Sequence, residues 1–203
     1  NPGAYSARCM KRSNGSQPPA CAISRAISAG SALVTLVWSS FVTAPLSVNA
    51  TPAPRTVLVT GAGRRLGRAI AIDLARAGWR VAVHYHSSQQ DALETVAACA
   101  GSTGGAAAFD ADLTSEAATR ALLPRVVAAL GAVDAVVNSA ALFDYDDAAS
   151  FGHAQMERHW RTNTAAPILL AQALAEHLAA RDARAASGCV VNLLDQKLFN
   201  PNP

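Results

Sequence analysis

Residues 56–67 read Thr56-Val57-Leu58-Val59-Thr60-Gly61-Ala62-Gly63-Arg64-Arg65-Leu66-Gly67, and this segment is the strongest indication of the fold. Its first part is a short β-branched run, and its second part is a glycine-rich turn that opens into a helix with Leu66, Ile70 and Leu74 on one stripe. A helix that begins at a glycine turn offers unpaired N–H groups and the positive end of its dipole to an anion. This order predicts a phosphate-binding turn, and the alternative is a tight turn between strand and helix that binds no ligand.

Strand and helix patterns alternate outward from this stretch. Apolar runs predict strands over 56–60, 80–84, 106–109, 135–138 and 190–194. Amphipathic runs predict helices over 66–77, 90–100, a region after Thr114, and 154–180. Thr114 is expected to cap the third helix, Pro124 to kink it, and Pro167 to interrupt the fourth. The alternation predicts an α/β fold, a Rossmann-type doubly wound parallel sheet with its ligand crevice at the carboxyl ends of the strands.

Residues 1–54 differ in composition from the rest of the chain. They contain no Asp or Glu, and they run from Lys11 and Arg12 through an apolar patch at 32–38 to small residues at 48–50. That order is typical of a secretory signal peptide, and its Ser-rich character also suits a transit peptide; a disordered extension is the alternative. We expect one domain over 55–203 and a cytoplasmic protein, or organelle or secretory targeting if residues 1–50 are a genuine signal.

Composition excludes several classes of partner. A formal net charge of +3 over 203 residues is too small and too scattered to indicate nucleic acid. The segment 29–48 is rich in Ser and Thr and would make a poor membrane helix. The four cysteines form no CxxC pair and no cluster with histidine, so neither a metal site nor a disulfide framework is expected. The expected partner is a small-molecule substrate.

A series of short motifs follows the glycine turn. The turn has the form Thr-Gly-x-x-x-Gly-x-Gly, except that Arg65 replaces the middle glycine. The later motifs are His84-Tyr85-His86-Ser87-Ser88, Asp112-Leu113, Asn138-Ser139-Ala140-Ala141 and Asn163. Over residues 55–203 this order resembles the short-chain dehydrogenase/reductase family. Arg65 and the stretch at 84–88 are similar to the pteridine reductases within that family.

The resemblance implies a dinucleotide site. Its expected residues are Gly61, Arg64, Arg65, Leu66, Gly67, His86, Ser87, Ser88, Asp112, Leu113, Asn138, Ser139 and Ala140. An NAD site usually has a carboxylate after the second strand to hold the ribose 2′-OH, and this chain has none between Val83 and Gln90. Arginine and hydroxyl donors suit a 2′-phosphate instead, so NADPH is the expected cofactor.

The resemblance also implies an oxidoreductase that reduces a pterin-like molecule or a related carbonyl or imine. Asn163 matches the helix asparagine of the family's proton relay, where it would hold a water. Asp195 stands at the end of the fifth expected strand, where pteridine reductases have an aspartate, and it would orient the relay. Phe143 matches a residue that stacks on the pterin ring, and ordinary loop packing is the alternative.

The family's catalytic pair does not occur in the sequence. That pair is a tyrosine acid followed four residues later by a lysine that lowers its pKa. Tyr5, Tyr85 and Tyr145 do not have this spacing to Lys11 or Lys197. We therefore expect a fragment that ends before Tyr-x-x-x-Lys, with an incomplete sheet and no activity of its own, from a reductase that is a homo-oligomer at full length. The alternative is a non-catalytic dinucleotide-binding module.

Overall fold

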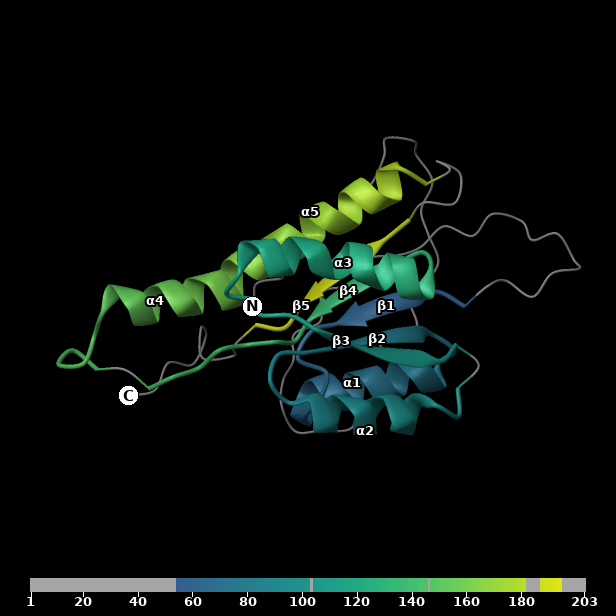
Figure 1. The fold of residues 1–203 in the computed structure, drawn as a ribbon, viewed down its shortest axis with the longest axis horizontal. Coiled ribbons are helices and arrows are strands. Elements are labelled where there is room, and N and C mark those ends of the chain that lie inside the picture. Colours follow the sequence, from purple (N-terminus) through teal and green to yellow (C-terminus); the bar gives the residue numbers. More distant parts are fainter. Residues whose placement is uncertain (1–53, 103, 146, 182–186, 195–203) are drawn as a thin grey trace, which may run out of the picture.

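A five-stranded parallel sheet forms the centre of the protein (Figure 1). The computed structural model describes residues 54–102, 104–145, 147–181 and 187–194. The strands are β1 (Thr56–Val59), β2 (Arg80–Tyr85), β3 (Ala106–Asp110), β4 (Ala135–Asn138) and β5 (Cys189–Asn192). Their order in space is β3-β2-β1-β4-β5, and all neighbours are parallel. The order reverses between β1 and β4, and in such sheets ligands bind at the carboxyl ends of those two strands.

Helices cover both faces of the sheet (Figure 1). One face carries α1 (Arg65–Arg76) and α2 (Gln89–Cys99), and the other carries α3 (Glu116–Leu130) and α5 (Ala166–Ala179). Side chains of β1 alternate between the two faces: Val57 and Val59 join the core under α1, whereas Leu58 joins the core that includes Leu122. The expectation of a doubly wound parallel α/β sheet is confirmed.

A long helical segment follows β4 and its loop. The helix α4 (His153–Trp160) continues through one π-helical turn, η2 (Arg161–Ala165), directly into α5. Within that turn the Ala166 N–H donates to the carbonyl of Arg161, five residues back. The expected interruption at Pro167 is therefore a change in hydrogen bonding just before the proline rather than a break, because a proline is tolerated in the first turn of a helix.

The expected cap of α3 is wrong by one residue. Ser115 caps this helix, and its Oγ accepts from the Ala118 N–H at 3.3 Å. Thr114 instead donates its backbone N–H and its hydroxyl to Oδ1 of Asp112, at 2.9 and 2.7 Å. The aspartate two residues earlier has captured the Thr114 hydroxyl, so that hydroxyl is not available to the helix.

The expected stripe on α1 is also incomplete. Ile70 and Leu74 are buried, but Leu66 is 44% exposed. The first turn of this helix borders a cavity rather than the core, which leaves the leucine outside the packed face. Helix α3 continues through Pro124 as a single element.

Some expectations fall on residues that the structure does not describe. The extension at 1–53 and Asp195 lie outside the described residues. Within the described ranges, no helix is both long and apolar enough to cross a bilayer. The same ranges hold no group of three or more His, Cys, Asp or Glu side chains placed to bind a metal ion.

Candidate functional site

A cavity of about 510 Å³ opens at the carboxyl ends of the strands. This volume lies within the range of small-molecule sites, roughly 300–1,000 Å³. Its walls come from the turn between β1 and α1, the end of β2, the loops after β3 and β4, and the helical segment. Most of the residues expected to bind a dinucleotide line it: Gly61, Arg64, Arg65, Leu66, Gly67, His86, Asp112, Leu113, Ser139 and Ala140.

The other three expected nucleotide residues are not among the residues that line this cavity. Asn138 ends β4 and donates from Nδ2 to Oδ1 of Asn192 at 2.8 Å, so it ties two strand ends together. Ser88 lies behind the glycine turn, where a Cβ added to Gly63 would stand 3.2 Å from its Oγ. Ser87 is exposed at the end of β2.

At Gly61 and Gly67 the glycine turn is packed too closely to accept a side chain. Gly61 has a φ of +63°, and a Cβ there would stand 2.8 Å from the Cα of Ala140. At Gly67 a Cβ would stand 2.3 Å from the carbonyl oxygen of Gly61. Gly61 therefore lies tightly against the loop after β4, and Gly67 lies tightly against the turn itself. The sequence pattern therefore reflects close backbone packing as well as any approach of a ligand.

The start of α1 is suited to an anion. Its N-cap residue, Arg64, makes no side-chain capping bond, and the first turn carries no acidic residue. The first N–H groups of a helix have no partner within the helix, and Arg64, Arg65, Leu66 and Gly67 at the start of α1 line the cavity, so the positive end of the dipole lies at its wall. Arg65 begins the helix with a φ of +49°, a conformation that glycine adopts more easily than arginine. This strained arginine occupies the position at which the family has its middle glycine.

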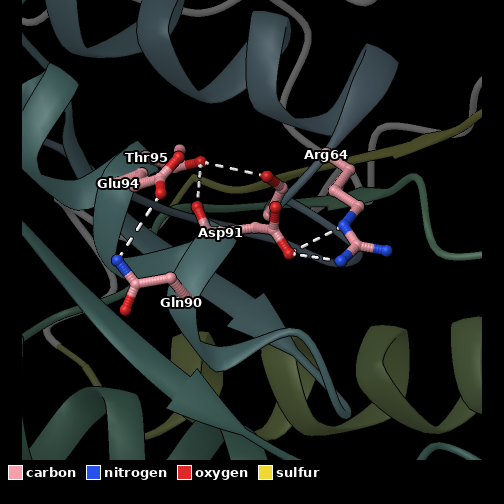
Figure 2. A network of polar contacts seen from close by, with 6 residues as sticks. Arg64, Gln90, Asp91, Glu94 and Thr95 are labelled. Atoms are coloured by element: carbon pink, nitrogen blue, oxygen red, sulfur yellow. Dashed lines mark hydrogen bonds and ion pairs between the residues drawn. The ribbon is translucent and has the colours of Figure 1, made fainter.

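Arg64 already has an anionic partner within the protein. Its Nε and Nη2 lie 2.7 and 2.6 Å from Oδ2 of Asp91, in the first turn of α2, and Figure 2 shows the guanidinium facing this carboxylate. The hydrogen bond from Arg64 holds the pKa of Asp91 below its ordinary value. On the same helix Thr95 Oγ1 donates to the carbonyl of Asp91 at 2.9 Å and lies 3.3 Å from the carbonyl of Gly63. Two contacts thus tie α2 to the glycine turn.

Thr60 joins the glycine turn to the loop after β4. Its Oγ1 accepts from the N–H groups of Ser139 and Ala140, both at 3.0 Å. The same hydroxyl lies 3.4 Å from the carbonyl of Val137. One buried hydroxyl therefore fixes the loop at the point where the strand order reverses. The sequence offers Thr60 only as the end of a strand, and nothing in its neighbourhood indicates these partners.

His84 joins the glycine turn to the loop after β3. The side chain is buried, its Nδ1 accepts from the Gly61 N–H at 3.1 Å, and its Nε2 lies 3.1 Å from the Ala111 carbonyl. Burial disfavours the charged imidazolium and lowers the pKa of His84 to about 4, so the ring is neutral at pH 7. The sequence shows this histidine only as part of a short motif, not as a bridge.

Asp112 is the only carboxylate among the described residues that line the cavity. Hydrogen bonds from Thr114 hold the pKa of Asp112 below its ordinary value. Arg158, another lining residue, lies 3.5 Å from the carboxylate of Asp144. Of the three lining arginines, Arg64 and Arg158 are each paired with a carboxylate, whereas Arg65 forms no ion pair among the described residues and is the one able to meet an anionic ligand.

Asn163 and Phe143, the expected catalytic and substrate residues that the structure describes, are not among the residues that line this cavity. Asn163, within the π-helical turn, holds the backbone of Leu142 with both atoms of its amide: Oδ1 accepts from the Leu142 N–H and Nδ2 donates to the Leu142 carbonyl, each at 2.8 Å. Leu142 lines the cavity, whereas Phe143 is 72% exposed and packs edge-on against Tyr145, with ring centroids 5.2 Å apart.

Comparison with known proteins gives the same assignment as this geometry. The family model described as short chain dehydrogenase matches residues 55–202. A hydroxynaphthalene reductase-like protein, Arp2, of Metarhizium majus is 32% identical over 126 residues, which are 62% of this chain and 47% of that protein. The short chain dehydrogenase/reductase nsrJ of Aspergillus novofumigatus is 32% identical over 58% of this chain and 45% of its own length. The chain thus spans about half the length of the curated relatives it matches.

Solved structures agree with the fold. FolM alternative dihydrofolate reductase 1 from Brucella canis, complexed with NADP, superposes with a TM-score of 0.66 at 32% identity, over 74% of this chain and 59% of that one. A short chain dehydrogenase from Burkholderia cenocepacia, also in complex with NADP, superposes with a TM-score of 0.59 at 32% identity. The match covers 63% of this chain and 52% of that one. With the family match over most of its length, the parallel sheet and the glycine turn at its carboxyl edge, this chain belongs to the short chain dehydrogenase family of oxidoreductases.

Proposed function

We propose that residues 55–203 form the NADPH-binding part of a reductase that acts on a pterin-like molecule or a related carbonyl or imine. The observation that carries the proposal is the cavity at the carboxyl edge of the sheet. At this cavity the start of α1, which has no side-chain cap, lies beside Arg64 and Arg65 of the glycine turn. Among the described lining residues, β2 contributes no carboxylate. This donor set fits a pyrophosphate at the helix start and a 2′-phosphate near the guanidinium groups.

Two similar structures support the choice of cofactor. The Brucella and Burkholderia proteins were both solved with NADP, and each is 32% identical to this chain. The Brucella protein is named as a dihydrofolate reductase, and dihydrofolate carries a pterin ring. This supports the pterin-like class over other carbonyl compounds. The exposed ring of Phe143, next to the lining residue Leu142, is our candidate for contact with such a ring.

NADPH, when bound, would supply a hydride to the substrate, and the chain's own residues would position the reactants. Asn163 would fix the wall of the site through its two bonds to Leu142 and would hold the water of a proton relay. Asp195 would orient that relay. The proton donor would be the tyrosine of the family's Tyr-x-x-x-Lys motif, which is not in this sequence. We therefore expect the 203-residue chain to bind NADPH without turning it over.

The cofactor proposal is tested by titrating NADPH and NADH into the full chain and into two arginine variants. Arg65→Gly is expected to lower the preference for NADPH at least fivefold, because it removes a cation from the cavity. The matched control is Arg76→Gln, which removes a charge from the far end of the same helix, where Arg76 pairs with Asp73. This control should leave the preference unchanged. An equal ratio in wild type and Arg65→Gly would contradict the role of Arg65.

The same titrations separate the reductase from a simple binding module. Addition of dihydrobiopterin to the NADPH complex should tighten NADPH binding if the chain holds part of a substrate site, without loss of absorbance at 340 nm. Unchanged NADPH affinity would favour the non-catalytic module. Steady NADPH oxidation would contradict the expectation that this chain lacks its proton donor.

A further inference from the structure

The two loops that flank β2 at the carboxyl edge are joined through a single residue. The strand lies between β1 and β3, so its last residues stand between the glycine turn on one side and the loop that carries Asp112 on the other. At this point His84 is buried, with 2% of its surface exposed, and both of its ring nitrogens lie within hydrogen-bond distance of backbone groups. A histidine with both nitrogens engaged in this way cannot turn without breaking a bond.

The direction of each bond follows from its partner. The Gly61 N–H can only donate, so Nδ1 of His84 accepts and carries no proton. The proton is then on Nε2, which donates to the carbonyl of Ala111. The ring is therefore a fixed tautomer that accepts from one loop and donates to the other. Burial, which keeps the ring neutral, preserves this arrangement at pH 7.

The backbone of the same residue makes a second bond to the turn. The Ala62 N–H donates to the carbonyl of His84 at 2.9 Å. The first two amides of the turn, those of Gly61 and Ala62, therefore both bond to His84. A phosphate at this turn must then be bound by later amides, at the start of α1, and their position depends on where Gly61 and Ala62 are held.

We propose that His84 is a positioning residue of the nucleotide site, which sets the distance between the phosphate turn and the loop that faces the adenine. This inference rests on the proposed function, because it assigns the two loops to two parts of one NADPH molecule. Through Gly61 the ring would fix the pyrophosphate side, and through Ala111 it would fix Asp112 and Leu113 on the adenine side.

Two substitutions separate the two bonds. In His84→Asn the side-chain oxygen can take the place of Nδ1 and accept from Gly61, and the Ala111 bond is lost. In His84→Gln the side-chain amide can take the place of Nε2 and donate to Ala111, while the Gly61 N–H is left buried without its acceptor. Asp134→Asn is the control for stability, because Asp134 accepts from the Thr56 N–H at the opposite end of β1.

The first measurement is hydrogen exchange at the Gly61 amide of the full chain. In wild type and His84→Asn the Gly61 amide should be protected from exchange. In His84→Gln its exchange rate, relative to that of amides in β1, should be at least tenfold higher. Equal protection in all three proteins would overturn the proposal. Ring nitrogen NMR of the wild type gives a test that needs no variant: a proton on Nε2 is expected, and a proton on Nδ1 would overturn the proposal.

The second measurement is the NADPH dissociation constant at pH 7.5. His84→Gln and His84→Asn should each weaken binding about tenfold, because each variant loses one of the two bonds that set the distance between the loops, and Asp134→Asn should weaken it less than threefold. Binding by either His84 variant within threefold of wild type would overturn the proposal. Failure of the wild type to bind NADPH would instead overturn the proposed function, and Gly61 exchange would still decide whether His84 holds the turn.

Discussion

Arg65 adopts a backbone conformation that costs stability. Its φ of +49° places a long side chain in a conformation that favours glycine. The sequence identifies Arg65 as an exception in a glycine pattern, and the structure shows the backbone reason for that pattern. The compensation we propose is a cation held beside the 2′-phosphate.

Arg65→Gly should therefore raise the free energy of unfolding by about 1 kcal/mol, the size of the penalty for a left-handed residue other than glycine. Urea unfolding of the full chain measures this. The same variant is expected to lose preference for NADPH, so stability and selectivity should move in opposite directions. A fall in stability would show that the arginine makes folding contacts that outweigh its backbone strain.

His84 makes stability depend on pH. Its pKa is about 4 in the folded protein, against about 6.5 in an unfolded chain, so the unfolded state binds more protons between these values. The neutral ring makes its full contribution to the free energy of unfolding above pH 6.5. This contribution, about 3 kcal/mol at most, is lost as the pH falls to 4. The charged neighbours His86, Asp110 and Arg125 change the pKa less than burial does.

Urea unfolding at several pH values compares wild type with His84→Asn. Carboxylates titrate in both proteins, so the difference between the two curves isolates His84. We expect the wild type to lose more stability than the variant between pH 6.5 and 4. Parallel curves would mean that the ring is protonated in the folded protein at an ordinary pKa.

The sequence predicted some neighbours of the glycine turn and missed others. The glycine pattern identified Gly61, Arg64 and Arg65 as neighbours of one cavity, because they are adjacent in the chain. Asp91 and His84 were missed as partners of this turn, although each bonds to it directly. Their contacts cross 27 and 23 positions of sequence, and only the packing of α2 and β2 beside β1 brings them together.

At the scale of elements, hydrophobic periodicity was sufficient for the sheet. Each strand was expected within two residues of its observed ends, because buried parallel strands are continuous apolar runs. The predicted cap at Thr114 and the predicted burial of Leu66 are both wrong for a similar reason. Both residues lie near the start of a helix, where periodicity does not determine the partner of a side chain. Asp112 binds the Thr114 side chain, and Leu66 lines a cavity.

The turn between β1 and α1 gives an element-scale prediction. Gly67→Ala should lower the free energy of unfolding by about 1–3 kcal/mol, because its Cβ would meet the Gly61 carbonyl and displace the turn. Gly101→Ala is the matched control, since a Cβ there would meet nothing within 4 Å. The control should stay within about 0.5 kcal/mol of wild type in thermal or urea unfolding. Equal effects of the two substitutions would contradict the close packing of the turn.

At the scale of the whole molecule, the strand order places the site. The reversal between β1 and β4 brings loops from distant parts of the chain to one edge, and Thr60 and His84 hold those loops from opposite sides of the turn. The sequence predicted the fold class and the edge, because the alternation of strands and helices fixes both. It could not predict the hydrogen bonds by which Thr60 and His84 join these loops, because those bonds depend on three-dimensional distances.

We propose that arginines of the glycine turn hold the 2′-phosphate of NADPH at this edge. Phosphorus NMR of NADP⁺ bound to the full chain, titrated over pH, tests this role. A nearby guanidinium favours the doubly charged phosphate, so its pKa in the complex should fall at least one unit below the ordinary value of about 6. A bound 2′-phosphate that titrates at the same pH as in free NADP⁺ would contradict the role of the arginines.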